Sequence, residues 1–224
     1  MARVTDEPRE PRARLSRERV LRAAVALADA GGIEALSMRR LGQELGVEAM
    51  SLYNHVANKD DLQSGMVEMV VREFEMPSDE ADWKEAIRKS AISAHDTLLR
   101  HRWAPNLMMR VTAVSPARLC WNEFVLGTFR EAGFSADLTH HAYHALESHI
   151  TGFTLWQANM PFDTREELVD MAQDFLRDFP VDDYPYFIEH VRQHLEPSSP
   201  SGATEFEFAL DLMLDGLERL RADG

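Results

Sequence analysis

The chain has 224 residues, 45% of them apolar, which is enough to bury one small and one larger core and excludes disorder as its overall state. Its one cysteine, Cys120, cannot form an internal disulfide, and the charged, proline-containing start is not a secretory leader, so we expect a cytoplasmic protein. No segment approaches the ~18 consecutive apolar residues that span a membrane, so we expect no membrane association.

The net charge of −14 is unevenly distributed along the chain. Residues 1–59 contain 10 Lys and Arg against 8 Asp and Glu, whereas residues 60–224 contain 14 against 30. Affinity for DNA is largely phosphate neutralisation, so the average charge argues against a nucleic-acid partner. The asymmetry instead points the N-terminal part toward phosphates and the acidic remainder away from them, although acidic surfaces also serve solubility alone.

Residues 1–15 contain four arginines and two prolines and no apolar period, which predicts a flexible arm. Such an arm either reaches into a DNA minor groove or is a tail without a role. Ser16 then caps a first helix that ends at Gly31 and Gly32. The apolar residues of this helix keep the 3.6-residue period: Val20, Ala24, Leu27 and Ala28.

Residues 37–59 predict two short helices joined by a tight turn, and the first of them begins after Ser37. The Ser37 hydroxyl can accept a hydrogen bond from the free N–H groups of the first turn. Leu41 and Leu45 lie on one face of this helix, and Gly46 ends it where a left-handed residue is needed.

The second short helix is predicted over residues 49–56, with Leu52 and Val56 pointing inward. A helix of about two turns is not stable alone, so a neighbour must bury this apolar edge. The side chains left outside suit a DNA major groove better than a protein core: Met50, Ser51, Tyr53, Asn54 and His55.

Lys59 begins a fourth helix that continues toward Pro77, and from residue 82 onward no strand-like alternation occurs. Prolines and glycines separate helix-length segments at 82–102, 104–113, 116–132, 135–159, 163–178, 184–195 and 203–222, with a polar loop at 196–203. We therefore predict an all-α protein with three parts: an arm at 1–15, a three-helix helix-turn-helix domain at 16–60, and a larger helical domain at 61–224.

The last helix carries two apolar faces. Thr204 and Glu207 form a capping box at its start. One face has 4, 3, 4, 3 spacing, with Phe206, Leu210, Met213, Leu217 and Leu220, and the other set is Phe208, Ala209, Leu212 and Leu214. Two faces must both be buried, which favours a partner subunit over a wholly internal helix.

Aromatic and methionine side chains in the larger domain are candidates for an apolar ligand pocket, with plain core as the alternative: Trp103, Met108, Met109, Trp121, Phe124, Phe129, Phe153 and Trp156. His140, His141 and His144 have spacings that can place two imidazoles on a metal. No cysteine or carboxylate cluster completes a set nearby, so a polar face or subunit contact explains them better. We predict no metal and no cofactor.

The segment from Leu15 to Gly65 resembles the DNA-binding region of the TetR family of bacterial repressors. The resemblance is carried by the capped first helix ending in Ala-Gly-Gly, by Leu-Ser-Met-Arg-Arg-Leu, Leu-Gly-Val and Ser-Leu-Tyr-Asn-His, and by Asn-Lys-Asp-Asp-Leu at 58–62. The sequences at 98–102, Leu-Leu-Arg-His-Arg, and at 131–134, Glu-Ala-Gly-Phe, resemble the effector-binding region of the tetracycline-repressor branch.

The resemblance implies a dimeric, ligand-responsive repressor that binds a palindromic double-stranded operator. By position, the phosphate contacts would be Ser37, Ser51, Tyr53, His55 and Lys59. Arg39, with Arg40 beside it, resembles a base-reading position. Ala49 and Met50 could offer only apolar contact, and Asn54 reads either a base or a phosphate. The last helix would pair with 135–159 across the dimer, through Leu146, Ile150, Phe206, Leu210, Met213 and Leu217.

The resemblance also bears on the effector. His101 matches a position that helps hold a metal-chelated drug in the tetracycline branch, but Glu73-Phe74 stands where a second histidine contributes there. We therefore expect a small apolar or amphipathic effector bound without a required metal. Its candidate contacts are His101, Trp103, Met109, Trp121, Phe124, Phe153 and Trp156.

Two other functions compete with a repressor. One is an all-helical metal-dependent enzyme that uses the histidines, and the other is a DNA-binding regulator without a small-molecule ligand. The sequence contains no Gly-rich phosphate loop, no H-E-x-x-H and no nucleophile elbow, so we do not expect an enzyme.

Overall fold

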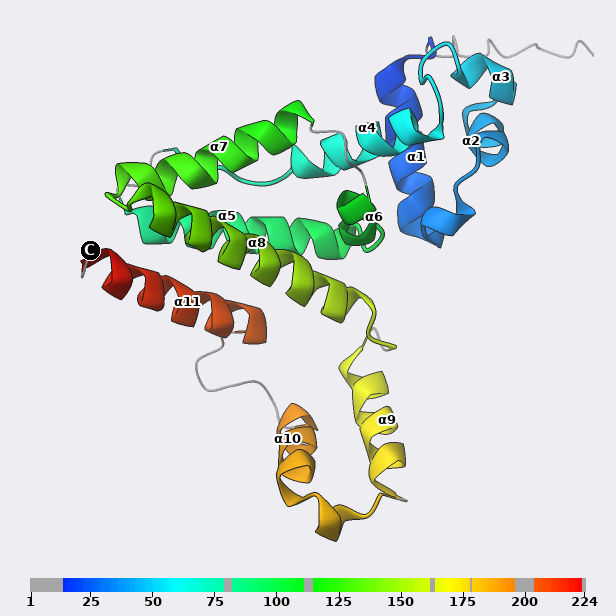
Figure 1. Cartoon of the computed structure of the whole chain (residues 1–224). Coiled ribbons are helices and arrows are strands. Elements are labelled where there is room, and N and C mark those ends of the chain that lie inside the picture. The colour runs from blue at the N-terminus through cyan, green and yellow to red at the C-terminus, as the bar shows by residue number, and fades with distance from the viewer. Residues whose placement is uncertain are drawn as a thin grey trace, which may run out of the picture. The chain divides into compact units, whose positions relative to one another are not determined.

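The computed structural model describes residues 14–78, 82–110, 115–161, 164–177, 179–195 and 204–222, and within these ranges the regular structure is entirely helical (Figure 1). The predicted all-α class is confirmed. The chain divides into a head unit, Met1–Glu73 with Arg100–Cys120, and a body unit, Phe74–Leu99 with Trp121–Gly224. Most of the predicted arm and the predicted loop at 196–203 lie outside the described residues.

The head unit contains α1 (Arg17–Gly31), the 3₁₀ turn η1 (Ile33–Ala35), α2 (Met38–Leu45), α3 (Ala49–Leu52), α4 (Lys59–Val71) and α6 (Ala104–Arg110). Helix α1 packs against α2 and α4, and α2 packs against α3. Ser16 caps α1 as predicted, because its Oγ accepts a hydrogen bond from the Arg19 N–H at 3.2 Å. Residues of several helices share one small core: Val20, Ala24, Leu41, Leu52, Val56, Leu62 and Met66.

The second helix of the helix-turn-helix is shorter than predicted. It ends at Leu52 rather than near Val56, and the next residues form turns in which the His55 N–H donates to the Leu52 carbonyl at 2.9 Å. Arg17 Nη1 donates to the His55 carbonyl at 2.9 Å and so satisfies an acceptor at the end of these turns. Leu52 and Val56 are nevertheless buried, as predicted.

The body unit is built from α5 (Trp83–Arg100), α7 (Pro116–Glu131), α8 (Ala136–Ala158), α9 (Arg165–Arg177), the 3₁₀ turn η2 (Val181–Asp183), α10 (Pro185–Leu195) and α11 (Glu205–Ala222), except that Arg100 and the residues of α7 up to Cys120 are assigned to the head unit. These helices confirm the predicted segments. Helix α9 lies against α10, and α8 lies against α11 (Figure 1). None of the helices in the described ranges is long and apolar enough to cross a membrane.

Helix α11 is held on the body unit by both polar and apolar contacts. The predicted capping box is present, since the Thr204 N–H donates to Glu207 Oε2 at 3.0 Å and the Glu207 N–H donates to Thr204 Oγ1 at 3.2 Å. The Phe206 ring stacks between His95 of α5 and His149 of α8, with centroid distances of 3.9 and 4.6 Å. Arg88 of α5 forms an ion pair with Asp211 at 2.8 Å.

Candidate functional sites

The turn between α2 and α3 depends on two glycines. Gly46 is left-handed, with φ 67° and ψ 34°, as predicted. Gly42 lies where α2 meets the start of α3, and a Cβ built on it would be 2.8 Å from the Val47 carbonyl oxygen and 3.2 Å from the Ala49 nitrogen. Only glycine permits this approach of two backbones, which the sequence analysis did not identify.

Because the apolar residues of the helix-turn-helix are buried, its polar and aromatic side chains lie on the outside. Because Leu41 and Leu52 are fully buried, Met50 is left 74% exposed and Tyr53 44% exposed. Ser37 caps α2, since its Oγ accepts from the Arg40 N–H at 3.2 Å. Of the remaining predicted contacts, Ala49, Ser51 and His55 are half-buried. The others are exposed: Arg39, Arg40, Asn54 and Lys59. Within the described ranges no acidic side chain pairs with Arg39, Arg40 or Lys59, so their charges are available to phosphates.

A clamp between α1 and α4 fixes the position of this surface. The Arg17 guanidinium donates to both Asp61 carboxylate oxygens, at 2.7 and 2.8 Å, and Asp61 also accepts from the Ala57 N–H at 2.8 Å. The Arg17 hydrogen bonds, followed by that from Ala57, lower the pKa of Asp61 to about 2. Sequence patterns do not predict this pair, since its partners are 44 residues apart and no local pattern joins them.

His101 lies in a polar network of the head unit rather than in an open pocket. It is buried, with Nδ1 2.8 Å from Asp29 Oδ1 and Nε2 3.3 Å from Glu73 Oε1. Trp103 Nε1 donates to the same Asp29 oxygen at 2.7 Å, and Arg100 pairs with Glu73 at 2.9 Å. Both polar edges of His101 are therefore occupied by the chain itself, and His101 with Trp103 joins α1 to the corner between α5 and α6.

The other predicted effector contacts are dispersed. Trp121 is buried and donates from Nε1 to Ser90 Oγ at 3.1 Å. Met109 and Trp156 are exposed, and Phe153 packs on Phe206 with ring centroids 5.6 Å apart. The role of these residues stays a prediction, but they do not share the cavity described next.

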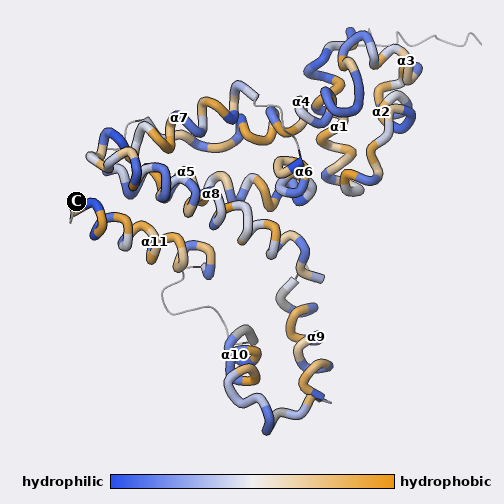
Figure 2. The backbone as a smooth tube through the Cα atoms, in the orientation of Figure 1, coloured by the Kyte–Doolittle hydropathy of each residue, from blue (hydrophilic) through white to orange (hydrophobic). Residues whose placement is uncertain are grey.

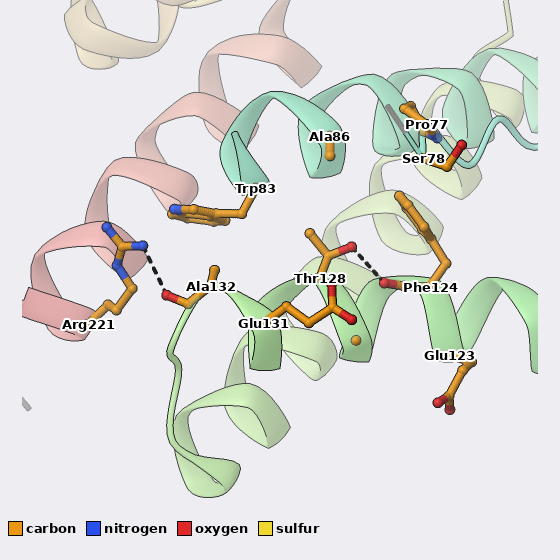
Figure 3. A pocket seen from close by; sticks show the side chains of 11 residues that line it. Pro77, Ser78, Trp83, Ala86, Glu123, Phe124, Thr128, Glu131, Ala132 and Arg221 are labelled. Atoms are coloured by element: carbon orange, nitrogen blue, oxygen red, sulfur yellow. Dashed lines mark hydrogen bonds between the residues drawn. The ribbon is translucent and has the colours of Figure 1, made fainter. Parts of the chain in front are cut away.

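A cavity of about 550 Å³ opens in the body unit between α5, α7 and the end of α11 (Figure 3). Trp83, Ala86 and Phe124 give it apolar walls, and Phe124 is the one predicted effector contact among its lining residues. The polar lining comes from Ser78, Glu123, Thr128, Glu131 and Arg221. A mid-helix glycine, Gly127, also lines it, a signal that the sequence analysis did not use.

The histidines of α8 form a surface cluster. The rings of His140 and His144 are 4.6 Å apart by centroid, those of His140 and His141 are 5.4 Å apart, and all three residues are exposed. In the part of the chain that the structure describes, no group of three or more His, Cys, Asp or Glu side chains is arranged to hold a metal ion.

Most of the predicted dimer contacts lie inside one chain. Leu146, Ile150, Phe206, Leu210 and Leu217 are all buried inside one chain, where they join α8 to α11, and Met213 is half-buried. The apolar residues that α11 leaves exposed are instead Phe208 at 63%, Leu212 at 57% and Leu220 at 57%. Hydrophobic residues recur along the whole of α11 in Figure 2 because the helix carries both sets. Helix α8 exposes Ala145, Ser148, Gly152 and Trp156.

Comparison with known families covers most of the chain. Residues 20–64 match the family described as bacterial regulatory proteins, tetR family. Residues 76–221 match the family described as tetracyclin repressor-like, C-terminal domain.

Individual proteins resemble the chain over nearly its full length. An HTH-type transcriptional repressor, DrrR1 of Streptomyces coeruleorubidus, is 30% identical over 223 residues, which cover 96% of this chain and 81% of the relative. The crystal structure of Streptomyces coelicolor ActR in complex with actinorhodin superposes with a TM-score of 0.76 at 27% identity, over 93% of this chain and 99% of ActR. BioQ bound to its double-stranded DNA operator gives a TM-score of 0.64 at 25% identity, over 91% and 98% of the two chains.

Proposed function

The chain belongs to the TetR family of bacterial transcriptional regulators, and from this premise we propose that it is a repressor that binds palindromic operator DNA as a homodimer and releases it when a small effector binds. We place it in the cytoplasm, where its operator would be. The observation that carries the proposal is the exposed helix-turn-helix surface, whose basic side chains have no acidic partner among the described residues.

The geometry of the head unit supports two kinds of DNA contact, one to phosphates and one to bases. Ser37 and Lys59 lie at the N-termini of α2 and α4, where free N–H groups attract phosphates. The other proposed phosphate contacts are Ser51 in α3, Tyr53 at its end and His55 in the turn that follows. Arg39 and Arg40 project from α2, and an arginine can pair bidentately with guanine. From α3, Ala49 and Met50 would meet the apolar edges of bases, and Asn54 would contact a base or a phosphate.

The body unit supports an effector and a partner subunit. Its cavity has a volume in the range of small-molecule sites, which favours an effector-responsive regulator over one without a ligand. For the dimer we propose the exposed strips of α8 and α11, including Phe208 and Leu212, in place of the buried residues. The relatives described above are regulators by name, so we propose no enzymatic activity.

Fluorescence anisotropy on operator DNA tests the proposal. The duplex is chosen by gel shift from DNA flanking the chain's own gene and compared with a scrambled duplex over a salt series. We expect Arg39→Ala to lose ~1–3 kcal/mol of binding free energy on the operator only, because base contacts carry specificity. Lys59→Ala should weaken both duplexes alike and lower the salt slope by about one unit.

Arg177→Ala is the matched control, since it removes an exposed arginine of the body unit. It should leave both affinities unchanged. Equal affinity of the unaltered chain for every duplex, with no palindromic preference, would rule out a specific repressor.

A further inference from the structure

We propose that the cavity between α5, α7 and α11 binds a flat aromatic cation. The inference rests on the proposed function only in taking this occupant to be the effector. Binding itself is a property of the body unit and is measured without DNA, so it can fail or succeed independently of repression.

The shape of the cavity is set by a glycine inside a helix. Glycine lowers the stability of a helix interior, so a packing reason is expected at such a position. Yet a Cβ built on Gly127 would meet no atom within 4 Å. The missing side chain therefore does not relieve a clash, and its effect is to keep open the wall of α7 that faces Trp83 and Ala86.

The walls of the cavity suit an aromatic body. Trp83 and Ala86 of α5 are 8% and 3% exposed, so their positions are fixed by packing, and Phe124 adds a half-buried ring from α7. Aromatic ligands gain from edge and offset contacts with such rings beyond the area that they bury. The volume of about 550 Å³ accommodates several fused rings.

The charge that we expect of the ligand depends on which ionic side chains of the cavity already have a partner in the chain. Arg221 Nη1 donates to the Ala132 carbonyl at 3.1 Å, and its guanidinium lies 5.6 Å from the centre of the Trp83 ring. Glu131 has no hydrogen bond or ion pair with any described residue. It is the last residue of α7, where a negative charge interacts unfavourably with the helix dipole. A cation is therefore the charge that this site lacks.

Two further observations favour a cation. In Figure 3 the Glu131 carboxylate lies among the lining side chains, whereas that of Glu123 turns away from them. Residues 60–224 hold 30 acidic against 14 basic side chains, so the field of this region also attracts cations.

Three probes with the same tricyclic frame separate shape from charge: the aminoacridine cation, neutral acridine and anthracene carboxylate. Probe fluorescence anisotropy is titrated with the full chain in the absence of DNA. We expect the cation to bind ~10-fold or more tightly than the anion, with acridine between them, because ion pairing adds to a shared aromatic contact. Equal binding of the cation and the anion would overturn the charge assignment.

Variants locate the site. Gly127→Leu should fill the cavity and reduce cation affinity by more than ~10-fold, since the bulk replaces the ligand's volume. Glu131→Gln should reduce it ~2- to 5-fold, the size of an exposed ion pair. Asp170→Asn changes the net charge of the body unit equally at an exposed position of α9 that does not line the cavity, and it should have almost no effect.

Circular dichroism establishes which variants fold. Cation binding by folded Gly127→Leu at unaltered affinity would overturn the site. If Gly127→Leu does not fold, the two charge variants decide, because equal effects of Glu131→Gln and Asp170→Asn would leave only the general field of the acidic body and no site.

Discussion

Asp61 contributes more to the head unit than its position on the surface suggests. It receives two hydrogen bonds from Arg17 and one from the Ala57 N–H, and so connects α1, the turn after α3 and the first turn of α4. His101 is comparable, because its two nitrogens face carboxylates of different segments. In both cases one side chain fixes where several helices meet, and the DNA-facing surface depends on those positions.

The acid dependence of stability follows from Asp61. Its pKa is about 2 in the folded chain against an ordinary value of 3.8, so the folded state favours the carboxylate. The stabilisation is complete above pH 3.8 and is lost as the pH falls toward 2. Because the two side chains are 31% and 46% exposed, we expect Asp61→Asn to cost at most about 1 kcal/mol near neutral pH.

Thermal melts followed by circular dichroism at several pH values check this expectation. The gap in melting temperature between the unaltered chain and Asp61→Asn should narrow as the pH approaches 2. Asp60→Asn, in the same helical turn but without a described partner, serves as the control and should show a smaller gap. If the difference in melting temperature did not change with pH, the stabilisation would not come from the charge of Asp61.

At the scale of elements, the helix-turn-helix is defined by a close approach of backbones. Helix α2 meets the start of α3 at Gly42, and α3 is only four residues long. So short a helix has little stability of its own, and its position depends on the burial of Leu52 and on this contact.

Gly42→Ala should therefore disrupt the DNA-reading element. The added methyl group would press on backbone atoms, which cannot rotate away, so we expect a loss of ~1–3 kcal/mol despite the better helix propensity of alanine. Operator affinity in the anisotropy assay should fall sharply.

The matched change is Gly65→Ala in α4, where a Cβ would meet the flexible end of Leu21, with Cδ2 at 2.6 Å. It should cost less, because a side chain can shift. If the two variants proved equally stable and bound DNA equally well, the close approach at Gly42 would not be a requirement of the fold.

Sequence patterns predicted elements well where the cause is local. The serine caps of α1 and α2, the left-handed Gly46 and the capping box of α11 each depend on residues within a few positions, and each is present. The predicted end of α3 was wrong because Tyr53, Asn54 and His55 donate to carbonyls three residues back rather than four, and no local pattern shows the contact of the His55 carbonyl with Arg17, 38 residues earlier. The surroundings of His101 and the lining of the cavity could not be predicted either, because they bring together segments that no local sequence pattern connects.

At the scale of the whole molecule, burial decides which apolar surface can face a second chain. Helix α11 covers its own chain with Phe206, Leu210 and Leu217 and leaves Phe208 and Leu212 exposed. A stable dimer removes such a surface from water and resembles a core divided between two chains.

The double variant Phe208→Glu with Leu212→Glu should therefore be a folded monomer in light scattering, with an unaltered helical spectrum. Leu210→Glu with Leu217→Glu should instead unfold the body unit, because it places charges in the core of one chain. Leu119→Glu, an exposed leucine of α7, is the control and should stay dimeric. A dimer of unchanged mass from the Phe208 and Leu212 variant would exclude this surface.

Cys120, on α7, is the one cysteine of the chain, and its side chain is exposed. A thiol-reactive dye therefore attaches to each polypeptide once and at a defined place. In an assembly of two chains, energy transfer between identical dyes depolarises their emission, and dilution with unlabelled chains restores it. The same residue thus allows subunits to be counted, and their exchange to be timed, on a protein whose sequence is otherwise unaltered.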